Sequence, residues 1–206
     1  GKLYKYDQLN RLKGAGSSNA SLTTATTSWI GTSSLSAFYT ESMDYDANGN
    51  IKILGRFGGQ NMSPPFRIDL LTYSYNKDPL TGALISNRLR HVKDVVAAGI
   101  SSVDIDSQAD DNYTYDKIGN LVGDASESIT RINWTVYGKI VTITKSGNTM
   151  QYGYDASGNR ITKTLSATNE DYYVRDAQGN VLALYGYDNS SCTWGEQHIY
   201  GSSRLG

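Results

Sequence analysis

Short runs of β-branched and aromatic residues recur along this chain, and turn-forming Gly, Asn and Asp residues separate them. Residues 139–144 and 160–165 are rich in Ile, Val and Thr and partly alternate apolar with polar positions, which predicts strands with one wet face. Residues 181–185 read Val-Leu-Ala-Leu-Tyr without a polar break, so we expect a strand that is buried on both faces. The pattern as a whole predicts an all-β fold.

One recurring motif, Tyr-Asp-x-x-Gly-Asn, lies between these runs. Asp at the first position of a type I turn accepts hydrogen bonds from N–H groups ahead of it, and Gly three residues later supplies positive φ. This combination predicts a three-residue hairpin loop with a β-bulge, and Asn can replace the Gly because it tolerates positive φ. The copies place the turn residues at Tyr6, Asp7 and Asn10; at Tyr45, Asp46 and Gly49; at Tyr115, Asp116 and Gly119; at Tyr154, Asp155 and Gly158; and at Asp176 and Gly179.

The spacing of the copies predicts a small repeating unit. Tyr6 and Tyr45 are 39 residues apart, Tyr75 and Tyr115 are 40 apart, and Tyr115 and Tyr154 are 39 apart. The last copy, with Arg175 in place of Tyr, follows after 21 residues. Residues 132–140 resemble a decayed copy with Trp134 in the Tyr position, and residues 73–76 with 87–89 resemble a copy interrupted by an insertion. The elementary unit is therefore about 20 residues, the length of one hairpin, and such repeats indicate an array.

These motifs resemble the RHS/YD-repeat family. Residues 4–12 and 113–121 carry the resemblance best, and it extends over nearly the whole chain apart from residues 14–37 and 92–110. The resemblance implies an array of β-hairpins that forms part of a spiralling, hollow RHS-type shell. In bacteria such a shell commonly encloses a toxic C-terminal domain that is released after secretion, whereas the related animal teneurins use theirs in cell-surface adhesion.

A structural role follows from this resemblance. It implies a non-catalytic segment of a secreted or surface-exposed bacterial protein, whose partners are the rest of its own shell, an encapsulated C-terminal toxin or effector, and a secretion machine. A teneurin-like adhesion or glycan-binding module is the alternative. Residues 172–206 resemble the beginning of the RHS core, but they lack the Asp-Pro motif of that core's self-cleaving protease, so no catalytic residue is carried over.

The repeats leave little room for other domains. We expect a single repeat array over residues 1–206, interrupted by a Ser/Thr-rich loop at residues 14–37. Because Gly1 lies within a repeat, we also expect a piece of a longer protein. Its cut ends would then expose unpaired strand edges and favour self-association.

Composition and charge bear on several classes of function. A formal net charge of −1 does not indicate binding to nucleic acid or to an anionic membrane surface. The longest apolar run is shorter than the about 18–20 residues that a membrane-spanning helix needs. We therefore expect no nucleic-acid partner and no membrane insertion. The single cysteine, Cys192, excludes an internal disulfide. Tyr outnumbers Phe by 16 to 3, which suits sheets with one wet face.

Two acidic stretches are candidates for metal binding. Residues 44–49 read Asp-Tyr-Asp-Ala-Asn-Gly and match the first half of a Ca²⁺ loop, but the twelfth position, which needs Glu, is Gly55. We therefore favour a turn role for Asp46, and expect no metal and no effect of Ca²⁺ on stability. Residues 104–111 contain four more aspartates, which we interpret as part of a solvated loop.

Catalysis and ligand binding have few candidate residues. Cys192 precedes His198 by six residues, but nothing marks an activated thiolate, so we expect neither enzymatic activity nor a cofactor. The repeat tyrosines could stack on sugars, yet their tie to the turn period favours a structural ladder with Tyr beside Tyr in successive hairpins. Arginines near the turns are expected to pair with the repeat aspartates of neighbouring units, and these are Arg11, Arg88, Arg160 and Arg175.

Overall fold

The computed structural model describes residues 2–17, 21–22, 29–30, 38–59, 66–166, 168–201 and 203–204. The chain divides into two compact units, Gly1–Asp111 and Asn112–Gly206, which we describe separately. All regular structure in the described residues is β, and the strands pair antiparallel, which confirms the predicted all-β class. None of these residues belongs to a helix long and apolar enough to cross a membrane.

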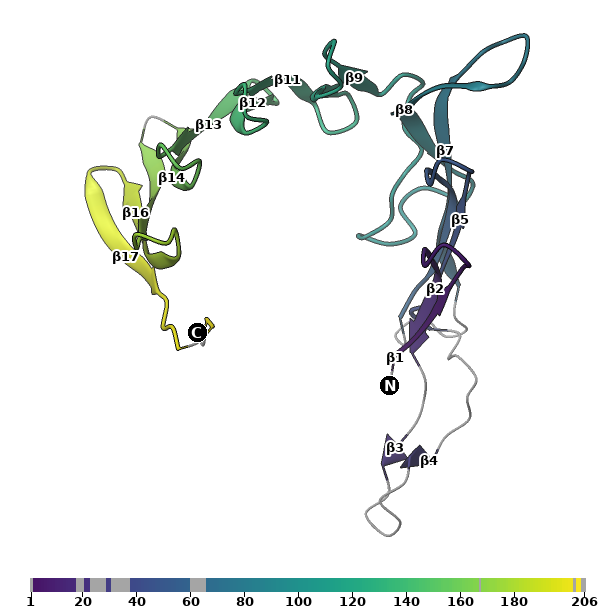
Figure 1. Cartoon of the computed structure of the whole chain (residues 1–206), viewed down its shortest axis with the longest axis horizontal. Helices are drawn as coiled ribbons and strands as arrows, with labels where there is room; N and C mark the ends of the chain where they lie inside the picture. The colour runs from purple at the N-terminus through teal and green to yellow at the C-terminus, as the bar shows by residue number, and fades with distance from the viewer. Residues whose placement is uncertain are drawn as a thin grey trace. The chain divides into compact units, whose positions relative to one another are not determined.

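Unit 1 contains a six-stranded antiparallel sheet with the strand order β1-β2-β5-β6-β7-β8 (Figure 1). A separate two-stranded sheet joins β3 to β4. Successive hairpins therefore lie side by side. The strands are β1 (Lys2–Tyr6), β2 (Leu12–Ser17), β3 (Ser21–Leu22), β4 (Trp29–Ile30), β5 (Glu41–Tyr45), β6 (Ile51–Phe57), β7 (Arg67–Lys77) and β8 (Leu84–Asp94).

Unit 2 is a nine-stranded meander in which every strand pairs with its sequence neighbours. The strands predicted at residues 139–144 and 160–165 are confirmed as β12 and β14, with ends shifted by one residue at most. The strands are β9 (Tyr113–Tyr115), β10 (Leu121–Asp124), β11 (Ile129–Trp134), β12 (Ile140–Lys145), β13 (Asn148–Tyr154), β14 (Arg160–Ser166), β15 (Asn169–Arg175), β16 (Val181–Asp188) and β17 (Ser191–Gln197).

Strand β16 corrects one expectation, because its apolar run is not buried on both faces. Leu182 is 39% exposed and Tyr185 is 37% exposed. Buried apolar side chains are few among the described residues, and they are Ile68, Leu71, Val92 and Ile132. The described strands therefore rest on a small apolar core, and most of their side chains contact neighbours on the same sheet face.

The expected loop at residues 14–37 begins later than predicted, because Gly14–Ser17 continue strand β2. Ser21–Leu22 pair with Trp29–Ile30, and the remaining residues of this loop lie outside the described part of the chain. The segment that follows β8 in the sequence turns back and pairs with that strand. There Gln108 N donates to Val92 O (2.9 Å) and Gln108 Oε1 accepts from Val92 N (2.8 Å). This contact covers part of the edge of β8.

Candidate functional site

The repeat turns share one backbone geometry. In each copy the Asp N–H donates to the carbonyl four residues later at 2.9–3.0 Å, and the residue in the Gly slot donates back to the Asp carbonyl at 3.0–3.2 Å. The predicted positive φ is confirmed at every copy: 58° at Asn10, 89° at Gly49, 103° at Gly119, 80° at Gly158 and 88° at Gly179. The strand register shifts beside these turns, as a β-bulge requires.

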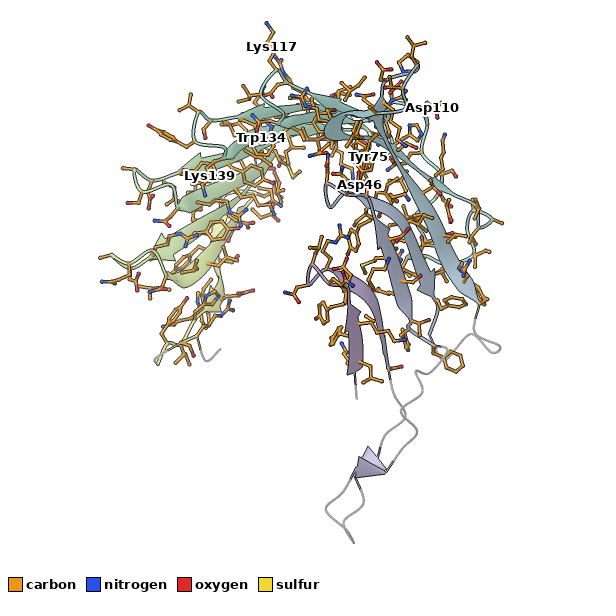
Figure 2. The ribbon with its side chains drawn as sticks, turned by 45° about the vertical axis from the view of Figure 1, so that its right-hand side comes forward. Asp46, Tyr75, Asp110, Lys117, Trp134 and Lys139 are labelled. Atoms are coloured by element: carbon orange, nitrogen blue, oxygen red, sulfur yellow. The ribbon has the colours of Figure 1, made fainter. Side chains whose placement is uncertain are left out.

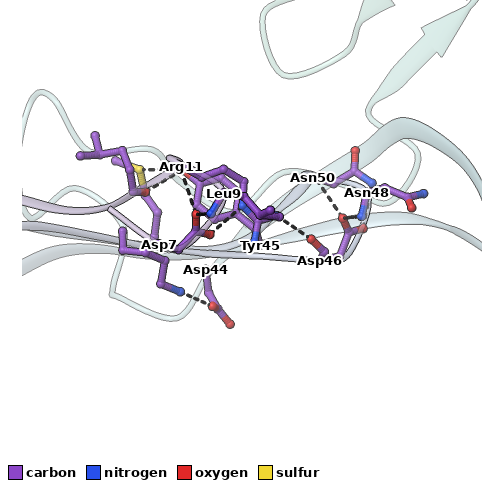
Figure 3. Close-up of polar contacts among 11 residues, drawn as sticks. Asp7, Leu9, Arg11, Asp44, Tyr45, Asp46, Asn48 and Asn50 are labelled. Atoms are coloured by element: carbon purple, nitrogen blue, oxygen red, sulfur yellow. Dashed lines mark hydrogen bonds and ion pairs between the residues drawn. The ribbon is translucent and has the colours of Figure 1, made fainter. Parts of the chain in front are cut away.

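Each repeat Asp side chain accepts hydrogen bonds from its own turn. In the second copy Asp46 Oδ1 accepts the N–H groups of Asn48 and Asn50, both at 2.9 Å, while Asp46 Oδ2 accepts Asn50 Nδ2 at 2.8 Å (Figure 3). The side chain of the final Asn therefore closes the turn, which sequence reasoning did not assign. In the first copy Arg11 Nε takes over this role and donates to Asp7 Oδ2 at 2.7 Å.

These hydrogen bonds stabilise the charged carboxylates. The Asn159 side chain is the main cause that holds the pKa of Asp155 below its ordinary value, and Asn180 has the same effect on the pKa of Asp176. The backbone N–H of Arg11 lowers the pKa of Asp7. The repeat aspartates are thus ionised turn residues rather than candidates for proton transfer.

A second regular feature joins one hairpin to the one before it. The side chain just ahead of the turn donates to the carbonyl of the first return-strand residue in the preceding hairpin, and we call these bonds the ladder. Figure 2 labels two ladder residues, Tyr75 and Trp134. The ladder bonds are Tyr45 Oη to Leu12 O (2.7 Å), Tyr75 Oη to Ile51 O (2.9 Å), Trp134 Nε1 to Leu121 O (2.8 Å), Tyr154 Oη to Ile140 O (2.7 Å), Arg175 Nε to Arg160 O (3.0 Å) and Tyr200 Oη to Val181 O (3.0 Å).

The ladder explains the imperfect copies. Trp134 and Arg175 depart from Tyr but each carries an N–H donor that reaches the same kind of carbonyl. The decayed copy keeps its turn, because Gly138 N donates to Thr135 O at 3.1 Å and Gly138 has a φ of 70°. The ladder that we expected had Tyr beside Tyr in successive hairpins, whereas the observed ladder runs from Tyr hydroxyls to backbone carbonyls of the preceding hairpin. Tyr200 is a ladder member that sequence reasoning missed because no Asp turn follows it.

Arg11 and Arg160 make contacts other than the predicted ion pairs with repeat aspartates of neighbouring hairpins, whereas the charge of Arg175 helps to lower the pKa of Asp155 in the preceding hairpin. Arg11 forms its ion pair with Asp7 of its own turn, at 2.7 Å. It reaches the next hairpin through Asp46 O, at 2.9 Å, and through the Tyr45 ring, whose centroid lies 4.8 Å from the guanidinium carbon. Arg160 stacks over the rings of Tyr152 and Tyr173, with 5.6 and 4.8 Å from its guanidinium carbon to the ring centroids. Arg11, Arg160 and Arg175 thus contact mainly backbone carbonyls and aromatic rings.

The candidates for chemistry are engaged elsewhere. Asp44 forms an ion pair with Lys13 at 2.5 Å, so its carboxylate is neutralised by a side chain of β2 (Figure 3). Cys192 is exposed on β17, whereas His198 contacts Glu196 at 3.0 Å. No hydrogen bond between Cys192 and His198 occurs among the described residues, so the formal Cys–His pair has no structural counterpart there.

The acidic stretch at residues 104–111 is not simply a solvated loop, which corrects our interpretation. Asp110 and Asp111 form ion pairs with Lys93 (2.9 Å) and Arg90 (2.5 Å). Asp104 instead turns inward, and burial, together with the charge of Asp69, raises the pKa of its carboxyl group. Its two oxygens are buried without a hydrogen-bond partner.

Comparison with known proteins bears on the sequence and on the fold. No protein-family model matches the chain. The tRNA nuclease WapA of Bacillus subtilis (strain 168) is 32% identical over 94 aligned residues, which cover 39% of this chain and 4% of WapA. The chain therefore spans only a small fraction of the relative that it matches.

Solved structures with similar folds come from Tc toxins. The crystal structure of TcdB2–TccC3–TEV is 13% identical in sequence and superposes with a TM-score of 0.47. The match covers 89% of this chain and 9% of the TcdB2–TccC3–TEV chain. The Photorhabdus luminescens Tc holotoxin pore is 15% identical with a TM-score of 0.42, covering 90% of this chain and 9% of that one. These likenesses are too distant to carry a conclusion about this chain.

Proposed function

We propose that this chain is a non-catalytic structural segment of a secreted or surface-exposed bacterial RHS/YD-repeat protein. The observation that carries the proposal is the ladder, in which six side chains at the same place in the repeat each donate to a backbone carbonyl of the preceding hairpin. Bonds between neighbouring repeats of this kind allow small units, each of which contacts only its neighbours, to form an extended array.

Two further observations support a structural role. The repeat aspartates, the most regular polar residues of the chain, use their carboxylate oxygens within their own turns. The similarity to a short stretch of WapA agrees with a repeat segment of a bacterial toxin. The nuclease activity in that protein's name is not proposed here, because the stretch is 4% of its length and the present chain has a net charge of −1.

In this proposal the segment is part of a β-shell that encloses a C-terminal toxin or effector. Its partners are the rest of its own shell, the enclosed domain and a secretion machine. The test is limited proteolysis of the whole gene product that contains this chain. The C-terminal domain is expected to resist protease in the wild type and to be cleaved faster when Tyr154→Phe and Gly158→Val are combined, whereas Tyr137→Phe leaves the protection unchanged.

Two results would overturn the shell proposal. One is a C-terminal domain that is cleaved equally fast in the wild type and in the combined variant. The other is a gene product in which a membrane anchor or cell-wall sorting signal, rather than a further domain, follows the repeats. That second result favours the adhesion alternative.

An aromatic row supports adhesion or glycan binding as the second candidate. Tyr172 pairs across strands with Tyr185, and Tyr185 pairs with Trp194, so the three rings share one face of β15–β17. Trp194 is 63% exposed, and none of the three belongs to the ladder. Quenching of Trp194 fluorescence by soluble glycans, lost in Tyr185→Ala, would favour this candidate, and an unchanged spectrum across a glycan panel would exclude it.

A further inference from the structure

Three aspartates from separate segments of unit 1 bring their carboxylate groups together. Asp69 lies on β7, Asp94 ends β8, and Asp104 belongs to the segment that follows β8. One carboxylate oxygen from each lies within 4.8 Å of those of the other two. Strand pairing and the return of the segment behind β8 bring them together, so the cluster is a product of the fold rather than of an acidic run.

The hydrogen bonds of this cluster leave several oxygens unused. Asp69 accepts Ile105 N at 2.9 Å and Arg56 Nε at 2.6 Å, and Asp94 Oδ1 accepts Leu70 N at 2.8 Å. In contrast, Asp94 Oδ2 and both oxygens of Asp104 are buried and have no hydrogen-bond partner. Three buried acceptors therefore meet without a donor between them.

The charge of the cluster is also unbalanced. Among the described residues, the cationic partner of these three carboxylates is Arg56, whose Nε lies 2.6 Å from Asp69 Oδ2. Three negative charges and one positive charge leave a net charge of −2. Burying carboxylates without partners is costly, and placing them beside one another adds repulsion. A native arrangement of this kind calls for either a cation or a bound proton in the space that the three side chains share.

We propose that Asp69, Asp94 and Asp104 bind a Ca²⁺ ion. An all-oxygen, all-carboxylate donor set selects hard cations such as Ca²⁺ and Mg²⁺ over zinc or copper. Oxygen separations up to 4.8 Å match ligands on opposite sides of an ion at Ca²⁺–O distances of about 2.3–2.6 Å. Mg²⁺ fits less well, because it demands near-ideal octahedral geometry that two strand residues and a loop residue do not impose.

The proposed ion has a defined structural effect. It joins the segment that carries Asp104 to β7 and β8, next to the hydrogen bond from Ile105 N to Asp69. Arg56 and the backbone N–H groups that bind Asp69 and Asp94 then act as the outer partners that orient the ligands. Our expectation that Ca²⁺ leaves stability unchanged therefore applies to the loop at Asp44 and not to the whole chain.

Ca²⁺ titration of the whole 206-residue chain tests the proposal. After chelator treatment, isothermal titration calorimetry at pH 7 is expected to show one Ca²⁺ per chain, and the thermal midpoint is expected to rise steadily with Ca²⁺ concentration. Mg²⁺ at equal ionic strength is expected to give a smaller rise. Asp104→Asn keeps the side-chain shape but removes a charge, so it should weaken Ca²⁺ binding at least tenfold.

Asp44→Asn is the matched control, because Asp44 is an acidic residue of the same unit that is paired with Lys13. This variant should bind Ca²⁺ as the wild type does. The proposal is overturned if the wild type shows no calorimetric binding, or if Asp104→Asn and the wild type respond equally to Ca²⁺. It is also overturned if the chelator-treated chain becomes more stable between pH 7 and pH 5 without any response to Ca²⁺, which would show that a proton balances the cluster.

Discussion

Gly158 allows the turn geometry to be tested almost free of packing effects. Its φ is +80°, and a Cβ atom added there would approach only Lys139 Cε, at an ordinary contact distance of 3.8 Å. The cost of Gly158→Val is therefore conformational. L-residues resist this region of φ by about 1–2 kcal/mol, and a β-branched side chain is especially poorly tolerated there. We expect the free energy of unfolding to fall by about 1–2 kcal/mol or more.

Urea unfolding of the whole chain, followed by far-UV circular dichroism at pH 7, measures this loss. Gly158→Asn should lose less, because Asn10 holds the same turn position at a φ of 58° in the first copy. Gly186→Ala is the control. It lies within β16, where a Cβ would be 3.6 Å from Thr193 Oγ1, so it should be neutral or stabilising by up to about 1 kcal/mol.

The reasoning is refuted if Gly158→Val and Gly186→Ala have the same effect on unfolding. It is also refuted if Gly158→Asn is at least as damaging as Gly158→Val. Either result would mean that positive φ at this turn position does not set the cost.

Three further predictions concern the ladder and the turn carboxylates. Tyr154→Phe should lower the free energy of unfolding by about 1 kcal/mol, because it leaves the Ile140 carbonyl without its ladder donor. Tyr137 lies in a turn and is 87% exposed, so Tyr137→Phe should change the free energy of unfolding by less than about 0.5 kcal/mol. Arg175→Tyr should keep the ladder bond and remain close to wild type in the same urea assay, while Arg175→Leu should cost about 1–2 kcal/mol. Because hydrogen bonds lower the pKa of Asp155, its contribution is complete above its unfolded pKa of about 3.9 and is lost as pH falls through the lower folded value. Acid titration should therefore show stability falling below about pH 4, with a shallower fall in Asp155→Asn.

The turns could be predicted from the sequence because their chemistry is local. Asp155, Gly158 and Asn159 lie within five consecutive residues, and their hydrogen bonds close within the same loop. The strands at residues 139–144 and 160–165 were predicted for a similar reason, since alternation is a property of a short window. Burial was harder, because the apolar run of β16 is half exposed and no local pattern tells whether another layer covers it.

The ladder and the three-aspartate cluster depend on contacts between separate segments. Tyr75 reaches Ile51, which is 24 residues away, and the choice of that carbonyl follows from sheet register rather than from any motif. Asp69 and Asp104 lie on different elements that only the return of the segment behind β8 brings together. Sequence reasoning treated Asp104 as solvated because nothing in its neighbours indicated that its carboxylate turns inward.

The central claim is that the residue ahead of each turn fastens its hairpin to the preceding one, and native-state amide hydrogen exchange of Tyr154→Phe tests it most directly. Tyr154 belongs to the β13–β14 hairpin, but its hydroxyl binds the carbonyl of Ile140 in the preceding β11–β12 hairpin. We predict faster exchange in both hairpins than in Tyr137→Phe. Faster exchange confined to β13–β14, or rates equal to those of Tyr137→Phe, would contradict the claim.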